Sequence, residues 1–96
     1  MSPNNKKKLN KLRKSLDKLD NSFIKLIKKR TNLVKKVLAL KVNKNQIVDK
    51  KRIKFILNQI RKKSIRNKID PKITNRIWKN MIYSYIDYER RNFKKK

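Results

Sequence analysis

Two basic residues stand in a helical stripe whose other members are apolar. Arg30 falls within a series of apolar residues spaced three and four apart, and Lys41 follows it eleven residues later, on nearly the same face. A guanidinium and an ammonium buried together repel each other and lose hydration. Such a burial is stable only where anions pair with the two cations. Because the chain has only six acidic residues, an anionic ligand is one candidate. The alternative is that Arg30 reaches solvent along its apolar stem.

Three acidic or basic residues elsewhere could complete such a site. Glu89, the only Glu in the chain, lies one turn after Tyr85 on the apolar side of a predicted helix. Its simplest structural role is a surface pair with a nearby Lys. Asp49 and Arg52 stand three residues apart, and their simplest role is helix capping together with a local ion pair.

Helices must position these side chains. The apolar series predicts one unbroken helix over 6–42. Asp49 and Asp70 can cap two further helices, and Pro71 suits the first helical position of the last one. The apolar series consists of Leu9, Leu12, Leu16, Leu19, Phe23, Leu26, Leu33, Val37 and Leu40, interrupted by Arg30. We expect one all-α domain over 1–96 with helices over 6–42, 49–66 and 70–92, a loop over 43–48, fraying near 64–68, and disordered ends at 1–5 and 94–96.

The length of the first predicted helix indicates a second chain. A helix of roughly 36 residues is about 54 Å long, whereas a compact domain of this size has a radius of gyration of only about 13 Å. Two shorter helices cannot cover such an apolar stripe. We therefore predict an intertwined homodimer, with a long coiled coil as the structural alternative.

The composition excludes several kinds of chemistry. The chain contains no Gly, so it has no Gly-rich phosphate loop. It contains no Cys and no His, which excludes a zinc site of the usual kind, a thiolate nucleophile and an imidazole base. No cofactor is expected. No apolar run is long enough to span a bilayer, and residues 1–8 lack the apolar core of a secretory signal, so we expect a cytoplasmic protein.

The net charge of +26 has two interpretations. It favours nucleic acid or another polyanion as a partner. However, Lys, Asn and Ile dominate the chain and all have A/T-rich codons, so a biased genome could place much of this charge on solvated faces.

Three groups of residues, taken in order and with their spacings, match a known pattern. The first group is Leu12 with Arg13, Leu19 with Asp20, Leu26 with Ile27, then Arg30 and Lys41; the second is Asp49 with Arg52; the third is Ile69 with Asp70, Ile77 with Trp78, and Met81 with Ile82. In this respect the chain resembles the all-helical class of chorismate mutase, from about Leu9 to about Asn92.

The resemblance implies an isomerase that converts chorismate to prephenate in aromatic amino-acid biosynthesis, without nucleophile, metal or cofactor. It implies a dimer whose long first helices cross, with two sites. Arg13 and Arg30 would clamp the two carboxylates of the substrate, and Lys41 would donate to its ether oxygen. Asp49 and Arg52 would hold the far end near the hydroxyl. Each site would combine Arg30, Lys41, Asp49, Arg52, Tyr85 and Glu89 of one chain with Arg13 of the other.

Three positions depart from the commonest family pattern. Ile53 replaces a Glu, Tyr85 replaces a small hydroxyl residue, and Glu89 replaces a Gln that donates to the ether oxygen. An ionised Glu only accepts hydrogen bonds, so Glu89 must be protonated to take that role. Fungal relatives also have Glu at this place.

Two alternative functions remain open at this point. Ile53 and the aromatic last helix also resemble the isochorismate pyruvate lyases, a sister branch with the same fold. A non-enzymatic, basic helical dimer that binds nucleic acid is the alternative from another class. The seven aromatic residues do not suggest a base-stacking platform, so we expect at most nonspecific nucleic-acid binding.

Overall fold

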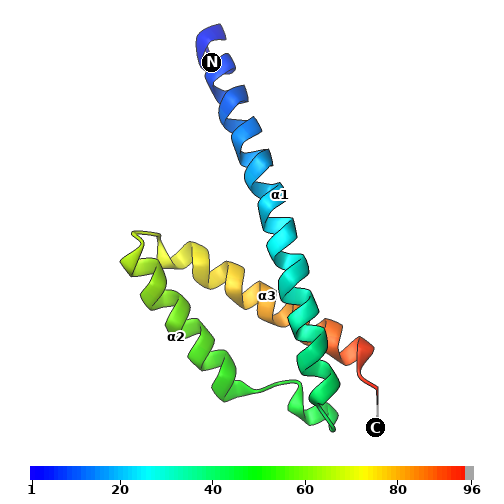
Figure 1. Cartoon of the computed structure of the whole chain (residues 1–96). Helices are drawn as coiled ribbons and strands as arrows, with labels where there is room; N and C mark the ends of the chain where they lie inside the picture. Colours follow the sequence, from blue (N-terminus) through cyan, green and yellow to red (C-terminus); the bar gives the residue numbers. More distant parts are fainter. Residues whose placement is uncertain (95–96) are drawn as a thin grey trace. The chain divides into compact units, whose positions relative to one another are not determined.

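The computed structural model describes residues 1–94 and shows an all-α chain in that range (Figure 1). The elements are α1 (Pro3–Leu40), a short 3-10 helix η1 (Lys44–Gln46), α2 (Lys50–Arg66) and α3 (Pro71–Asn92). The chain divides into two compact units, Met1–Leu33 and Val34–Lys96. Lys94 lies outside regular structure, and the disorder expected at Lys95 and Lys96 falls outside the described residues.

Helix α1 begins earlier than the apolar pattern suggests. Ser2 caps it: its Oγ accepts a hydrogen bond from the Asn5 backbone N at 3.2 Å, and its carbonyl accepts from Lys6 N at 2.9 Å. Pro3 occupies the first helical position, where its missing N–H costs nothing. The expected disorder of residues 1–5 is therefore wrong for Pro3 to Asn5.

The same helix ends two residues before the predicted position. Its last residue is Leu40, and the Lys41 N–H turns back to the Leu38 carbonyl at 3.1 Å, a tighter turn than that of an α-helix. The predicted loop over 43–48 contains the single turn of η1.

The Met1–Leu33 unit consists of helix α1 without its last two turns and has no buried side chain. Apart from the half-buried Leu9, the residues of the predicted apolar stripe are exposed; Leu16 is 58% and Phe23 60% accessible. This segment is thus helical while its apolar face lies open in the single chain.

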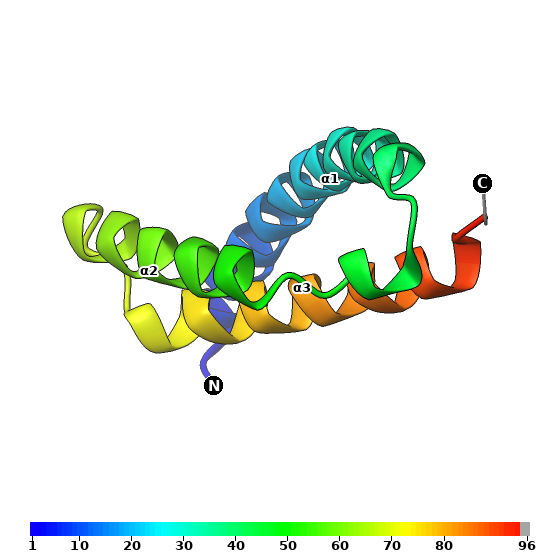
Figure 2. The ribbon, with the colours of Figure 1, turned by 90° about the horizontal axis from the view of Figure 1, so that it is seen from below.

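The Val34–Lys96 unit contains the hydrophobic core. Helices α2 and α3 pack against each other, and Figure 2 shows them side by side along this unit. The buried centre consists of Ile47, which follows η1, together with Ile82 and Ile86 of α3. Partly buried side chains surround this centre: Val48, Ile53, Ile56, Leu57 and Phe93.

The turn between α2 and α3 is well ordered, in contrast to the fraying expected near 64–68. Ser64 is only 2% exposed, and its Oγ donates to the Ile60 carbonyl at 2.6 Å and lies 2.7 Å from Thr74 Oγ1. Its carbonyl accepts from Ile69 N at 2.9 Å, and Lys68 N donates to the carbonyl of Ile65 at 3.1 Å. These two bonds form a Schellman motif, which satisfies the last carbonyls of α2.

The motif requires a left-handed residue at its centre. Glycine normally takes that place, but the chain has none, and Lys68 adopts φ 56° instead. Helix α3 then begins as expected, since the Asp70 side chain accepts from Lys72 N at 2.9 Å and Pro71 is the first helical residue.

Candidate active site

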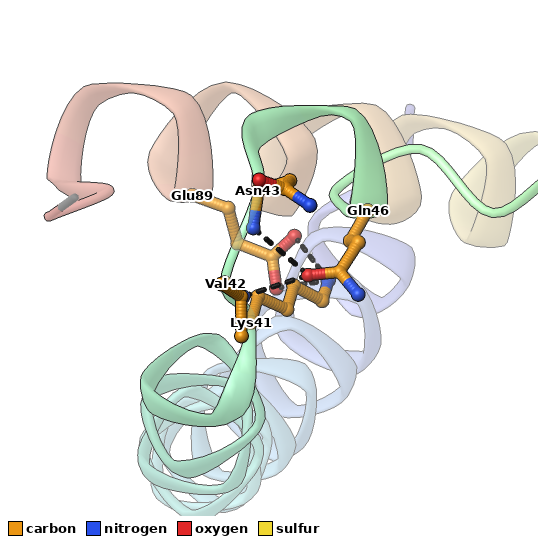
Figure 3. A network of polar contacts seen from close by, with 5 residues as sticks. All are labelled: Lys41, Val42, Asn43, Gln46 and Glu89. Carbon is orange, nitrogen blue, oxygen red and sulfur yellow. Dashed lines mark hydrogen bonds and ion pairs between the residues drawn. The ribbon is translucent and has the colours of Figure 1, made fainter. Parts of the chain in front are cut away.

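The structure brings two of the predicted site residues into direct contact. The Lys41 Nζ donates to both carboxylate oxygens of Glu89, each at 3.1 Å (Figure 3). The two residues are 48 positions apart in sequence. Only 18% of the Lys41 side chain and 8% of the Glu89 side chain are exposed. The pair is therefore a largely desolvated ion pair rather than the surface pair that is the simplest role for Glu89.

The position of Glu89 follows from the face of α3 on which it lies. Ile82, Ile86 and Glu89 are four and three residues apart, which is the spacing of one helical face, and all three are buried. A carboxylate carried on the core-facing side of a helix needs a partner to offset its lost hydration. The ammonium of Lys41, just beyond the end of α1, supplies that partner.

A side chain that sequence reasoning missed organises the turn next to Lys41. The Gln46 Oε1 accepts hydrogen bonds from Val42 N at 2.7 Å and Asn43 N at 3.0 Å, as Figure 3 shows. Asn43 and Gln46 form a capping box around η1. The spacing Asn-x-x-Gln is the sequence signal that could have revealed it.

Asp49 and Arg52 adopt the capping arrangement. The Asp49 Oδ1 accepts from the Arg52 backbone N at 3.0 Å and thereby caps α2. The Arg52 guanidinium lies 5.2 Å from the centroid of the Phe55 ring, a cation–π distance. Both Asp49 and Arg52 are exposed, so the Arg52 cation is accessible to a ligand from the solvent.

The remaining predicted residues are distributed over both units. Arg13 is exposed and Arg30 half-buried, both on the part of α1 within the Met1–Leu33 unit. Tyr85 is half-buried on α3, one turn before Glu89. Within the Val34–Lys96 unit, the structure thus joins Lys41 to Glu89 and places Tyr85 one turn before Glu89 on the same helix.

The arrangement suits binding and electrostatic stabilisation. The Lys41 ammonium is held in place before any ligand arrives, in a largely water-free setting where a charge acts more strongly than in bulk water. Its carboxylate partner accepts through both oxygens. A ligand atom that approaches Lys41 must therefore compete with Glu89.

Comparison with known proteins places the chain in a family. The model of the family "Chorismate mutase type II" matches residues 12–90. A chorismate mutase of Methanocaldococcus jannaschii is 37% identical over 79 residues, which cover 78% of this chain and 77% of the relative. No solved structure gives a significant match. Among the described residues, no helix combines the length and apolar character needed to cross a membrane. From the two matches we conclude that the chain belongs to the chorismate mutase type II family.

Proposed function

We propose that the chain is an isomerase that converts chorismate to prephenate, and that it works as a homodimer with two equivalent sites. The observation that carries the proposal is the buried contact between Lys41 and Glu89, in a chain that matches the family over residues 12–90.

The reaction is a concerted rearrangement, so the protein needs to hold and polarise the substrate rather than attack it. As the ether bond breaks, negative charge develops on its oxygen. A preorganised ammonium at that oxygen stabilises the transition state without having to reorient. Lys41 is the candidate donor, because its side chain is largely buried and is held in place by its ion pair with Glu89.

Glu89 decides how that donor is released. An ionised carboxylate beside the ether oxygen would oppose the developing negative charge, whereas a protonated one would add a second donor. We infer that, when substrate binds, Glu89 gives up its double contact with Lys41 and takes up a proton from the solvent, while Lys41 keeps its own.

The other predicted residues would bind the two ends of the substrate. Arg13 and Arg30 would each take a carboxylate, since the planar guanidinium matches a carboxylate with two parallel hydrogen bonds. Asp49 and Arg52 would lie near the ring hydroxyl, and Tyr85 would line the site. The exposure of Arg13 on a helix with no buried residue supports its assignment to the site of a second chain.

The exposed face of α1 supports the dimer. Full burial of one large apolar side chain contributes about 1.5–3 kcal/mol, whereas association costs roughly 4–15 kcal/mol. Six such side chains on each of two chains are large enough to offset that cost. The six are Leu12, Leu16, Leu19, Phe23, Leu26 and Leu33, each more than half exposed.

The decisive experiment uses two inactive variants in one dimer. Arg13→Ala and Lys41→Gln are each expected to lose nearly all chorismate mutase activity. An equal mixture, unfolded and refolded together, should regain about a quarter of the wild-type activity, because about half of the dimers are mixed and each has one intact site. If mixing restores nothing while each variant forms dimers, Arg13 does not serve the partner's site.

The same assay separates the sister activity. Wild-type protein receives chorismate and isochorismate in separate reactions. Prephenate from the first supports the proposal, and salicylate with pyruvate from the second would instead assign the lyase activity suggested by Ile53 and Tyr85. A cytoplasmic location stays a prediction, which fractionation of the source cells would check.

A further inference from the structure

The turn between α1 and α2 is held by one side chain that the family comparison does not single out. The Gln46 Oε1 accepts from two successive backbone amides, Val42 N at 2.7 Å and Asn43 N at 3.0 Å. The bond from Asn43 N is the capping-box bond, in which the side chain of the third residue of a helical turn accepts from the backbone N–H of the N-cap residue. Gln46 thus folds the end of η1 back onto the residues that directly follow Lys41 (Figure 3).

The other end of this turn is fixed to the core. Ile47 follows η1 directly and is only 4% exposed. It packs with Ile82 and Ile86, on the face of α3 that also carries Glu89. The turn is therefore held to α3 by the packing of Ile47, and its two ends are joined by the hydrogen bonds to Gln46. These contacts fix the position of the turn relative to Glu89.

Lys41 stands where these constraints meet. Its own N–H bonds to the Leu38 carbonyl at 3.1 Å, which ties it to the end of α1. The residue after it, Val42, is bonded to Gln46. Hydrogen bonds on both sides of Lys41 thus restrain its backbone. Its Nζ lies 3.1 Å from the Glu89 carboxylate.

We propose that Gln46 is a positioning residue, whose amide oxygen fixes the turn that aims the Lys41 ammonium at Glu89. The consequence for catalysis rests on the proposed mutase function, but the geometric claim does not. Since a misplacement of about 1 Å can cost up to 10²-fold in rate, loss of this oxygen should lower kcat about tenfold and change KM little.

The kinetic test compares four variants of the full chain. Gln46→Ala and Gln46→Met both remove the acceptor, and Gln46→Met keeps the length of the side chain. Gln46→Glu keeps an acceptor oxygen and should restore kcat to within about threefold of the wild type, since a carboxylate also accepts from backbone amides. Asn45→Ala, at an exposed position of the same 3-10 helix, is the matched control and should behave as wild type.

The outcomes separate positioning from mere stability. A fall in kcat in the Ala and Met variants, with rescue by Gln46→Glu and unchanged helix content, supports the proposal. Equal kcat in wild type, Gln46→Ala and Gln46→Met would overturn it, as would a loss that Gln46→Glu fails to restore.

A second measurement is independent of any activity. Glu89 is the only Glu in the sequence, so protein labelled with ¹³C-glutamate gives one assigned side-chain carboxyl signal. Lys41→Gln supplies the position of that signal without the ammonium. In Gln46→Ala and Gln46→Met the signal should move most of the way to that position, and in Asn45→Ala it should stay.

An unmoved signal in Gln46→Ala and Gln46→Met would refute the positioning role even if the kinetics were altered. If wild-type protein fails to convert chorismate while the signal moves as expected, the proposed function fails and the positioning role stands.

Discussion

Both units of the chain contain amphipathic helices, but they differ in what these helices bury. Val34–Lys96 buries Ile47, Ile82 and Ile86 together with a charged pair, whereas the α1 segment of Met1–Leu33 is as regular in its apolar spacing and buries nothing. The same kind of apolar spacing thus accompanies helices in both units. The second unit encloses a hydrophobic core, whereas the apolar face of the first is exposed in the single chain. We proposed above that a second copy covers this face.

The largest expected effect comes from breaking the charged pair in the second unit. Lys41→Met removes the proposed donor and should lower kcat/KM by about 10²–10³-fold. It should also cost about 3 kcal/mol or more in the free energy of unfolding, because Glu89 stays buried without its partner.

A double variant separates the two effects. Lys41→Met with Glu89→Leu removes both charges and should recover most of the stability, since paired burial of charge adds little over an apolar core. It should stay inactive. Chemical unfolding and a prephenate assay check both statements, and recovered activity in the double variant would remove Lys41 from the mechanism.

The next effect tests the open face of the first unit. Phe23→Asp places a charge in the apolar stripe and should raise the dimer dissociation constant by at least about 100-fold, which corresponds to about 2.7 kcal/mol. Asn21→Asp adds the same charge on the polar face of the same helix and is the control. Sedimentation over a range of concentrations measures both, and equal dissociation constants would mean that another surface forms the dimer.

A smaller effect concerns the protonation of Glu89. If Glu89 acts as a neutral donor, the kcat of the wild type falls as the pH rises. Glu89→Gln donates at every pH and should show a flat profile. Identical pH–rate profiles in the two proteins would remove the proton from the mechanism.

The smallest effect lies at the turn between α2 and α3. Lys68 adopts a left-handed conformation that is strained because the residue has a Cβ. Lys68→Gly removes this strain and should raise the free energy of unfolding by about 0.5–1 kcal/mol. Lys62→Gly, within α2 and also exposed, should lower it by about 1 kcal/mol. A loss of stability in Lys68→Gly would show that the side chain contributes more than the strain costs.

The sequence predicted what depends on local pattern. The three helices follow from apolar spacing, and Asp49 and Asp70 act as N-caps because capping needs only residues two or three positions away. The early start of α1 carried a similar local signal in Ser2 and Pro3, but the apolar series begins only at Leu9 and masked it.

Long-range features required the structure. The distance between Lys41 and Glu89 depends on how the η1 turn seats Ile47 against α3, and no periodicity encodes that. The roles of Arg13 and Arg30, which lie on the other unit, stay predictions.

The bare apolar face of α1 has a consequence for the cell. If only paired chains are active, the amount of active enzyme rises with the square of the chain concentration wherever the protein is dilute. A modest change in expression would then alter flux more than proportionally, and every newly made copy would stay idle until it met another.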